Sequence, residues 1–218
     1  MNFAGVKAIT IPEGDVRSIA IGGVTVWQKP NPLPYDAEVE YVESTGSQYV
    51  NTGLSMASGA FEAGVDFDSQ YTDNSFVVGV MGDATSGTTY QKRLAFYHVA
   101  NNTNYVIDRG TAGSRITGSG YVVDTGKLSY AIVLNSAKNI LICRANRGGA
   151  TYPLRGRVRY FKLWDSTDTL VRDFVPVRVG TAGYLYDRAN PTGGPSGNGL
   201  YGSATSTPLV AGPDKNGG

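Results

Sequence analysis

The stretch Phe61-Glu-Ala-Gly-Val-Asp-Phe67 decides the fold class of this chain. Its odd-numbered positions are all apolar, whereas its even-numbered positions are Glu, Gly and Asp. Successive side chains of a β-strand point to opposite faces, so this alternation predicts a strand with one buried face. The same alternation recurs in Leu128-Ser-Tyr-Ala-Ile-Val-Leu134.

Many similar runs follow one another, separated by Gly, Asn, Asp, Ser and Thr, and no window predicts an amphipathic helix of more than a turn or two. Short alternating runs with turn residues every ~8–12 positions are typical of an all-β sandwich or barrel. Imperfect alternation in 157–164 indicates a β-bulge. The further candidate strands are 38–42, 48–51, 75–80, 93–99, 104–108, 120–123, 139–144, 157–164, 170–177 and 183–186, with final short runs at 200–201 and 209–210.

The N-terminal residues 1–29 form a separate small β-hairpin module in this interpretation. Alternating runs precede and follow Gly22-Gly23, a pair that suits a two-residue primed turn. A module of so few short strands is rarely stable alone. We therefore expect it either to pack on the main domain or to dock on another chain. If it is an anchor, its apolar contacts are Ile9, Ile11, Ile19, Ile21, Val24 and Trp27.

Three prolines within Lys29-Pro-Asn-Pro-Leu-Pro34 predict an extended spacer without ladder donors. The expected organisation is therefore a module at 1–29, a linker at 30–36, a β-domain at 37–213 and a flexible tail at 214–218.

Composition excludes several classes of function. Among 218 residues the net charge is +1 and charged residues are 17%, which gives no electrostatic footprint for nucleic acid or an anionic membrane. No segment approaches the ~20 apolar residues of a membrane span. Residues 1–5 show no basic and apolar signal segment, so we expect the chain to be assembled in a cytoplasm.

Catalytic side chains are scarce, and we expect no enzymatic activity. The lone His98 and Cys143 lie in strand-like runs, and no nucleophile motif surrounds any serine. Alternation places Glu38 and Glu40 on one face, but Glu43 falls on the other unless a bulge intervenes, so outward polar positions explain all three better than a glycosidase pair does.

We expect no cofactor, although calcium stays open. Calcium needs six to eight converging oxygen ligands, and no D-x-D-x-D-G loop is present. Isolated aspartates in turns are the simpler explanation for the acidic loop positions. The candidates are Asp66, Asp68, Asp73, Asp83 and Asp108.

Tyrosines near Asn-, Thr- and Gly-rich segments suggest a contact surface. Sugars stack on aromatic rings while Asn, Asp and Arg bond their hydroxyls. Plain packing and contact with a partner or second subunit are the alternatives. The candidate glycan- or partner-binding residues are Tyr90, Arg93, Tyr97, Asn101, Asn102, Asn104, Tyr105 and Arg109.

Three stretches carry a resemblance to a known family. Glu38-Val-Glu-Tyr-Val-Glu-Ser-Thr-Gly-Ser-Gln-Tyr-Val-Asn-Thr-Gly53, the run 156–165 and Leu170-Val-Arg-Asp-Phe-Val-Pro-Val-Arg178 followed by 183–188 resemble, in order, the motifs of laminin-G-like, concanavalin A-like jelly-roll domains of gut bacteria and their phages. The run 7–14 with 24–27 is similar to short modules that open phage structural proteins.

The resemblance implies an antiparallel two-sheet jelly-roll with a face that binds glycans in relatives. Together with the layout, it predicts a virion structural protein, such as a capsid decoration, head fibre or tail appendage, that attaches to other virion proteins through residues 1–29. We expect a homo-oligomer, host-surface glycans as partners, and neither nucleic acid nor membrane. The alternative is a bacterial cell-surface adhesin or carbohydrate-binding module.

Overall fold

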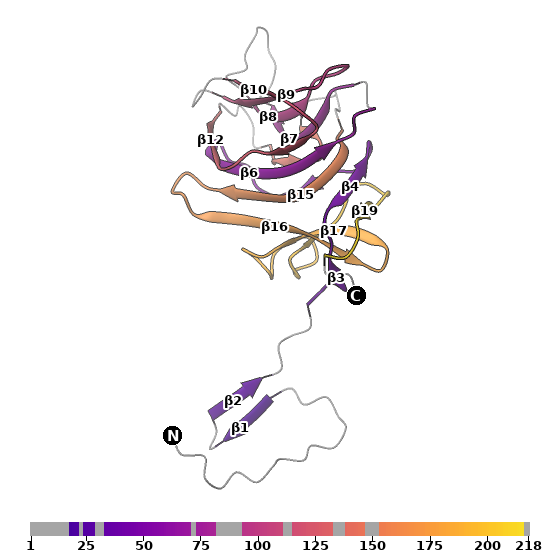
Figure 1. Ribbon diagram of the computed structural model, residues 1–218. Coiled ribbons are helices and arrows are strands. Elements are labelled where there is room, and N and C mark those ends of the chain that lie inside the picture. Colours follow the sequence, from indigo (N-terminus) through magenta and orange to yellow (C-terminus); the bar gives the residue numbers. More distant parts are fainter. Residues whose placement is uncertain are drawn as a thin grey trace. The chain divides into compact units, whose positions relative to one another are not determined.

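The computed structural model describes residues 18–21, 24–28, 33–70, 73–81, 93–110, 115–132, 138–146 and 153–215. Within these ranges every regular element is a strand and none is a helix, so the predicted all-β class is confirmed (Figure 1). The chain separates into two compact units, residues 1–33 and 34–218. Their boundary falls inside the proline-rich stretch expected to be a linker.

The described residues of the first unit form an antiparallel hairpin. Strand β1 (Ser18–Ile21) pairs with β2 (Val24–Gln28), with Ile21 opposite Val24 and a register shift after Ile19. Four of the six expected anchor residues, namely Ile19, Ile21, Val24 and Trp27, belong to these strands. Ile9 and Ile11 lie outside the described residues.

In the second unit, one sheet has seven strands in the order β10-β9-β8-β7-β13-β5, with β14 added beside β7. Its pairings are antiparallel except for β14, which runs parallel to β7. The bounds are β5 (Val50–Asn51), β7 (Ser75–Met81), β8 (Arg93–His98), β9 (Asn104–Arg109), β10 (Ile116–Ser119), β13 (Leu141–Ile142) and β14 (Ala145–Asn146).

The other sheet has ten strands, ordered β11-β6-β15-β4-β19-β17-β16-β3, with β12 beside β6 and β18 beside β17. Its bounds are β3 (Ala37–Glu38), β4 (Val42–Thr45), β6 (Ser58–Phe67), β11 (Val122–Asp124), β12 (Leu128–Ala131), β15 (Arg155–Trp164), β16 (Leu170–Val179), β17 (Ala182–Asp187), β18 (Leu200–Tyr201) and β19 (Leu209–Ala211).

The long strand β15 organises the larger sheet. One edge pairs with β6, while the other pairs with β4 in its first half and with β16 in its second half. Strands β15, β4, β19, β17 and β16 therefore close into a ring, which alternation alone did not predict. The predicted bulge in β15 is present as a register shift between Val158 and Tyr160.

Both large sheets contribute to one apolar core. The four odd positions of the 61–67 run are buried, as alternation predicts. Phe61 stacks against Phe161 within the larger sheet, and Phe67 meets Phe96 of the smaller sheet edge-on with 5.5 Å between ring centroids. The core therefore lies between the two sheets, and the binding surfaces must be sought on their outer faces and edges.

Tyrosine rings cover several glycines in and beside these strands. A Cβ added to Gly64 would lie 2.3 Å from the ring of Tyr160, its cross-strand partner. Glycine leaves room for such a ring, and the ring in turn covers backbone that has no side chain of its own. The same arrangement occurs at Gly118 under Tyr105, Gly202 under Tyr184 and Gly212 under Tyr41.

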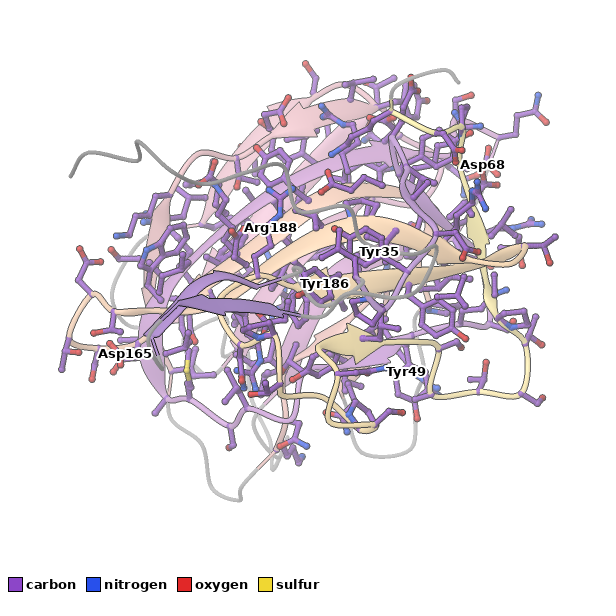
Figure 2. All side chains as sticks on the ribbon, turned by 90° about the horizontal axis from the view of Figure 1, so that it is seen from below. Tyr35, Tyr49, Asp68, Asp165, Tyr186 and Arg188 are labelled. Atoms are coloured by element: carbon purple, nitrogen blue, oxygen red, sulfur yellow. The ribbon has the colours of Figure 1, made fainter. Side chains whose placement is uncertain are left out.

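Residues 214 and 215, near the C-terminus, are attached at the β3 edge of the larger sheet. Tyr35 lies against Tyr186 with ring centroids 5.0 Å apart (Figure 2). Arg188 bonds the carboxylate of Glu38. Arg178 donates to both carboxyl oxygens of Asp214, at 2.7 and 2.8 Å. Residues 214 and 215 thus belong to the folded unit, where the sequence led us to expect a flexible tail, because this ion pair and a backbone bond from Lys215 to Glu38 attach them.

Candidate functional site

The structure distributes the predicted glycan-binding residues over two sides of the smaller sheet. Tyr97 packs on the face turned away from the shared core, whereas Tyr105 packs against that core. Arg109 lies on the same face of β9 as the core residue Ile107, and it donates to the backbone oxygen of Ser129 on the larger sheet. Tyr90 lies outside the described residues. These residues therefore do not form one surface.

On the outer face, Arg93 and Tyr97 join a cluster around Asp108. The Asp108 side chain is fully buried, and it accepts from Arg93 Nε at 2.8 Å and from Arg115 Nε at 2.8 Å. Both guanidinium groups also reach the Tyr97 hydroxyl, at 3.4 and 3.5 Å. Because arginines occupy both of its oxygens, Asp108 does not offer the calcium ligand considered from the sequence.

Tyr97 is held tightly in this cluster. Its ring stacks on Phe76 with centroids 4.6 Å apart and planes 15° from parallel. Burial raises the pKa of the Tyr97 hydroxyl, which therefore stays protonated at neutral pH. The arrangement is a packed ion-pair cluster on the outer face of the smaller sheet, and we expect it to stabilise that sheet.

Asn101 and Asn102 belong to the turn between β8 and β9, and Asn104 is the first residue of β9. Asn101 adopts φ 52°, a left-handed conformation that Asn tolerates better than most residues. The side-chain oxygen of Asn102 accepts from the backbone N–H of Asn104 at 3.1 Å. The turn geometry is thus sufficient to explain why asparagines occur here.

His98 is buried at the end of β8. Its ring stacks on Tyr121 at 5.0 Å and lies 5.1 Å from Phe67, and its Nε2 has no hydrogen-bond partner among the described residues. Burial lowers the pKa of His98, and backbone groups of Thr103 and Val99 oppose that shift. Ser75 lies opposite His98 on β7, but its hydroxyl bonds the backbone oxygen and N–H of Arg155, so the buried neutral imidazole has a packing role.

This burial predicts a pH dependence of stability. Since the folded pKa lies below the ordinary value of 6.5, the unfolded chain binds the proton first as the pH falls. The His98 contribution is complete above about pH 6.5 and is lost between that pH and the lower folded pKa. Urea titrations from pH 7.5 to 5.5 should show this decline, and His98→Phe should remove it because the chain has one histidine. Equal pH profiles for the two proteins would contradict the assignment.

Cys143, Glu38 and Glu43 are engaged in packing or pairing, and the Glu40 side chain is exposed. Cys143 is buried, and burial raises the pKa of its thiol to about 12, so it is unreactive. Glu38 pairs with Arg188 and Lys215, and Glu43 pairs with Arg157. The described residues contain no group of three or more His, Cys, Asp or Glu able to hold a metal ion.

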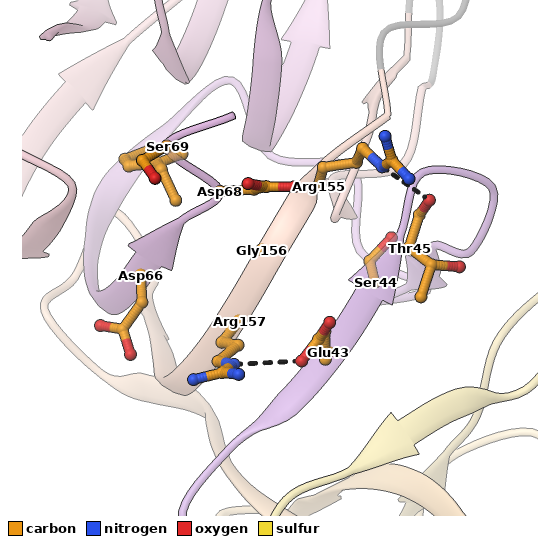
Figure 3. A pocket seen from close by; sticks show the side chains of 10 residues that line it. Glu43, Ser44, Thr45, Asp66, Asp68, Ser69, Arg155, Gly156 and Arg157 are labelled. Carbon is orange, nitrogen blue, oxygen red and sulfur yellow. Dashed lines mark hydrogen bonds and ion pairs between the residues drawn. The ribbon is translucent and has the colours of Figure 1, made fainter. Parts of the chain in front are cut away.

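A polar groove lies across β4, β15 and β6, at the start of β15 (Figure 3). Two cross-strand rows build it. Arg157 lies opposite Glu43 on β4 and opposite Asp66 on β6, and Arg155 lies opposite Thr45. Because every second residue of a strand shares a face, these side chains project together on the outer face of the larger sheet.

Both arginines lean toward β4. Arg157 Nε donates to Glu43 at 3.0 Å with its guanidinium 4.3 Å from the ring centroid of Tyr41, and Arg155 Nε donates to the backbone oxygen of Thr45 at 3.1 Å. The bond to Glu43 raises the pKa of Arg157, so this guanidinium stays charged. This side of the groove therefore holds two fixed guanidinium groups together with the carboxylate of Glu43.

The opposite wall carries Asp66, Asp68 and Ser69. One Asp66 oxygen lies 3.0 Å from Arg159 Nε without hydrogen-bond alignment, and one Asp68 oxygen accepts from the backbone of Gln70 at 2.9 Å. No bond to the second oxygen of either carboxylate is found within the described part of the chain. These oxygens remain as acceptors.

Gly156 forms the floor between the two arginines (Figure 3). Its φ is +146°, and an added Cβ would lie 2.3 Å from the backbone oxygen of Asp66. That Cβ position is directed at β6 and not into the groove, so the floor is the Gly156 backbone, and the groove above it encloses about 390 Å³ between the two arginines and the acidic side chains of the opposite wall. Such an arrangement suits a ligand that presents several hydroxyl groups, each of which both donates and accepts.

Sequence reasoning did not identify this groove, although Asp66 and Asp68 were considered as calcium ligands. The available signal was Arg155-Gly-Arg157, a pair of charges around a glycine in an alternating strand.

Within the described ranges, no helix is both long and apolar enough to cross a membrane. Comparisons with protein-family models, with curated proteins and with solved structures found no match.

Proposed function

We propose that this chain is a non-catalytic glycan-binding protein displayed on a phage or prophage virion, with the groove across β4, β15 and β6 as its binding site. The observation that carries the proposal is the pairing of arginine donors with aspartate acceptors across the bare floor at Gly156. A sugar ring can lie on that floor with hydroxyls bonded to both walls.

The unit 34–218 is proposed to be a jelly-roll of the concanavalin A-like class. Support comes from two largely antiparallel sheets that share one core, and from the three sequence motifs that resemble this class. The closed ring of β15, β4, β19, β17 and β16 would be a local elaboration of that plan.

Binding through one groove is expected to be weak. The polar walls are already hydrated, so only the difference between protein and water hydrogen bonds contributes to affinity. Display of many copies, including a homo-oligomer, converts weak single-site affinity into avidity.

Attachment is assigned to residues 1–29 because they belong to a compact unit separate from the glycan-binding one. Particles assembled with a chain lacking residues 1–29 should lose this protein, while the truncated chain still binds its glycan. Normal incorporation of the truncated chain would contradict the anchor, whereas absence of the full-length chain from particles would favour the surface-adhesin alternative.

The groove itself predicts a binding defect without a folding defect. Asp68→Asn keeps the oxygen that accepts from Gln70 but removes the carboxylate charge. Hydrogen bonds to charged groups contribute about 1.5–3 kcal/mol, so affinity should fall at least ~10-fold. A glycan array with the full chain selects the ligand, and calorimetry measures the change in Kd.

Glu62→Gln provides the matched control, because Glu62 lies on the same strand and face as Asp66 but outside the groove, 3.7 Å from Lys162. Its Kd and the Tm of both variants should stay near those of the parent chain. Equal losses in both variants, or no glycan retained by the array, would count against the groove.

A further inference from the structure

A second cavity, of about 440 Å³, lies in the unit 34–218 beside Tyr184 of β17 and Val179 at the end of β16. It is bounded by the loop around β18, by Tyr184 and by Asn51. None of the side chains that line it carries a charge, in contrast to the groove with its arginines and aspartates. This cavity therefore suits a neutral group.

Two asparagine amides face this cavity with their oxygens already engaged. Asn51 Oδ1 accepts from the backbone N–H of Gly53 at 3.0 Å, and Asn198 Oδ1 accepts from that of Leu200 at 3.3 Å. Neither amide nitrogen donates a hydrogen bond to another described residue. Both amides are held through their oxygens, so the groups offered to a ligand are N–H donors.

The remaining lining is apolar. Val179 is 37% exposed, and it lines the cavity together with Leu200 and the ring of Tyr184. Tyr184 is fixed in place over Gly202, where an added Cβ would lie 2.8 Å from its ring. An apolar group brought here would cover exposed apolar surface, which favours binding by about 25 cal/mol per Å² of area removed from water.

We propose that this cavity binds the acetamido group of an N-acetylhexosamine, an inference that rests on the glycan-binding function proposed above and names its sugar class. The acetamido carbonyl accepts from the asparagine amides, and its methyl group packs on Val179 and Leu200. The group is neutral, as the lining requires. A free hydroxyl at the same carbon offers no methyl group and a poorer acceptor.

The test compares chitotriose with cellotriose, two β-1,4-linked glucose-type trisaccharides that differ in the acetamido groups. Nuclear magnetic resonance titrations of the full chain should show chitotriose binding with shifts at residues 196–203, and at least 10-fold weaker binding of cellotriose. Asn198→Asp retains the oxygen that accepts from Leu200 and removes the N–H donors, so it should weaken chitotriose at least 10-fold.

Asn74→Asp is the control, because Asn74 likewise accepts a backbone N–H through Oδ1, from Ala100, but lies outside the cavity. Its chitotriose affinity should match that of the parent chain. Equal affinity for the two trisaccharides overturns the acetamido assignment. Glycan binding that responds to Asp68→Asn but not to Asn198→Asp overturns the second cavity and leaves the proposed function standing, whereas no binding of any glycan overturns both.

Discussion

Replacing Asp108 with alanine is expected to lower the free energy of unfolding by about 3 kcal/mol, through loss of the carboxylate that Arg93 and Arg115 share. Breaking a buried ion pair from one side typically costs about 3–5 kcal/mol. The lower end applies because the two arginine side chains are 21% and 32% exposed and retain some hydration. In a unit of this size the Tm should fall by roughly 6–12 °C.

Asp124→Ala is the control for this change. Asp124 also bonds an arginine and a tyrosine hydroxyl, namely those of Arg159 and Tyr160, but its side chain is 53% exposed. Exposed pairs contribute about 0–1 kcal/mol, so its Tm should change little. Urea unfolding of both variants measures the difference, and equal midpoints would show that the Asp108 cluster does not stabilise the sheet.

The second large effect is expected at the groove floor. Gly156→Ala should destabilise the protein by roughly 2–4 kcal/mol, since it combines an unfavourable φ with overpacking against backbone. The added methyl group would lie 2.3 Å from the oxygen of Asp66 and 3.1 Å from Cα of Phe67, so β15 would have to move away from β6. Glycan binding should fall together with stability, because the floor is displaced.

Gly180→Ala separates these two causes. Gly180 also has a positive φ, of +59°, but an added Cβ there meets no atom within 4 Å. It should therefore show only the conformational cost of about 1 kcal/mol and unchanged binding. If Gly156→Ala lowers the free energy of unfolding no more than Gly180→Ala does, the close approach of β15 to β6 does not constrain residue 156 to glycine.

Alternation predicted β6 and β8 well because one face of each packs on the shared core, and β16 was found although both of its faces are buried between Phe174 and Val177. Strands β6, β8, β9 and β16 lie within two or three residues of the expected bounds. The region 139–146 follows no alternation because Ile140, Leu141, Ile142 and Cys143 are all buried, and a positive φ at Cys143 turns the chain between two short strands. The short β10 (Ile116–Ser119) was not expected, since its Thr, Gly and Ser resemble a turn.

The closed ring and the groove depend on contacts between distant segments. The ring requires β15 to change partners from β4 to β16 along one edge, which no local pattern reveals. The groove joins residues 43–45, 66–69 and 155–157, whereas the sequence-based candidates were grouped by proximity along the chain. Tyrosines near asparagines seemed suited to sugars, but several of these rings cover glycines or pack on Phe76 and His98.

The most direct test of the account is to map where a glycan contacts the wild-type chain. A ligand selected on an array is titrated into the isotope-labelled full-length protein, and amide shifts are followed by nuclear magnetic resonance. If the groove is the binding site, shifts are expected at residues 43–45, 66–69 and 155–157, with the glycan recovered uncleaved. Shifts confined to the face carrying Arg93, Tyr97 and Asp108, or cleavage of the glycan, would contradict it.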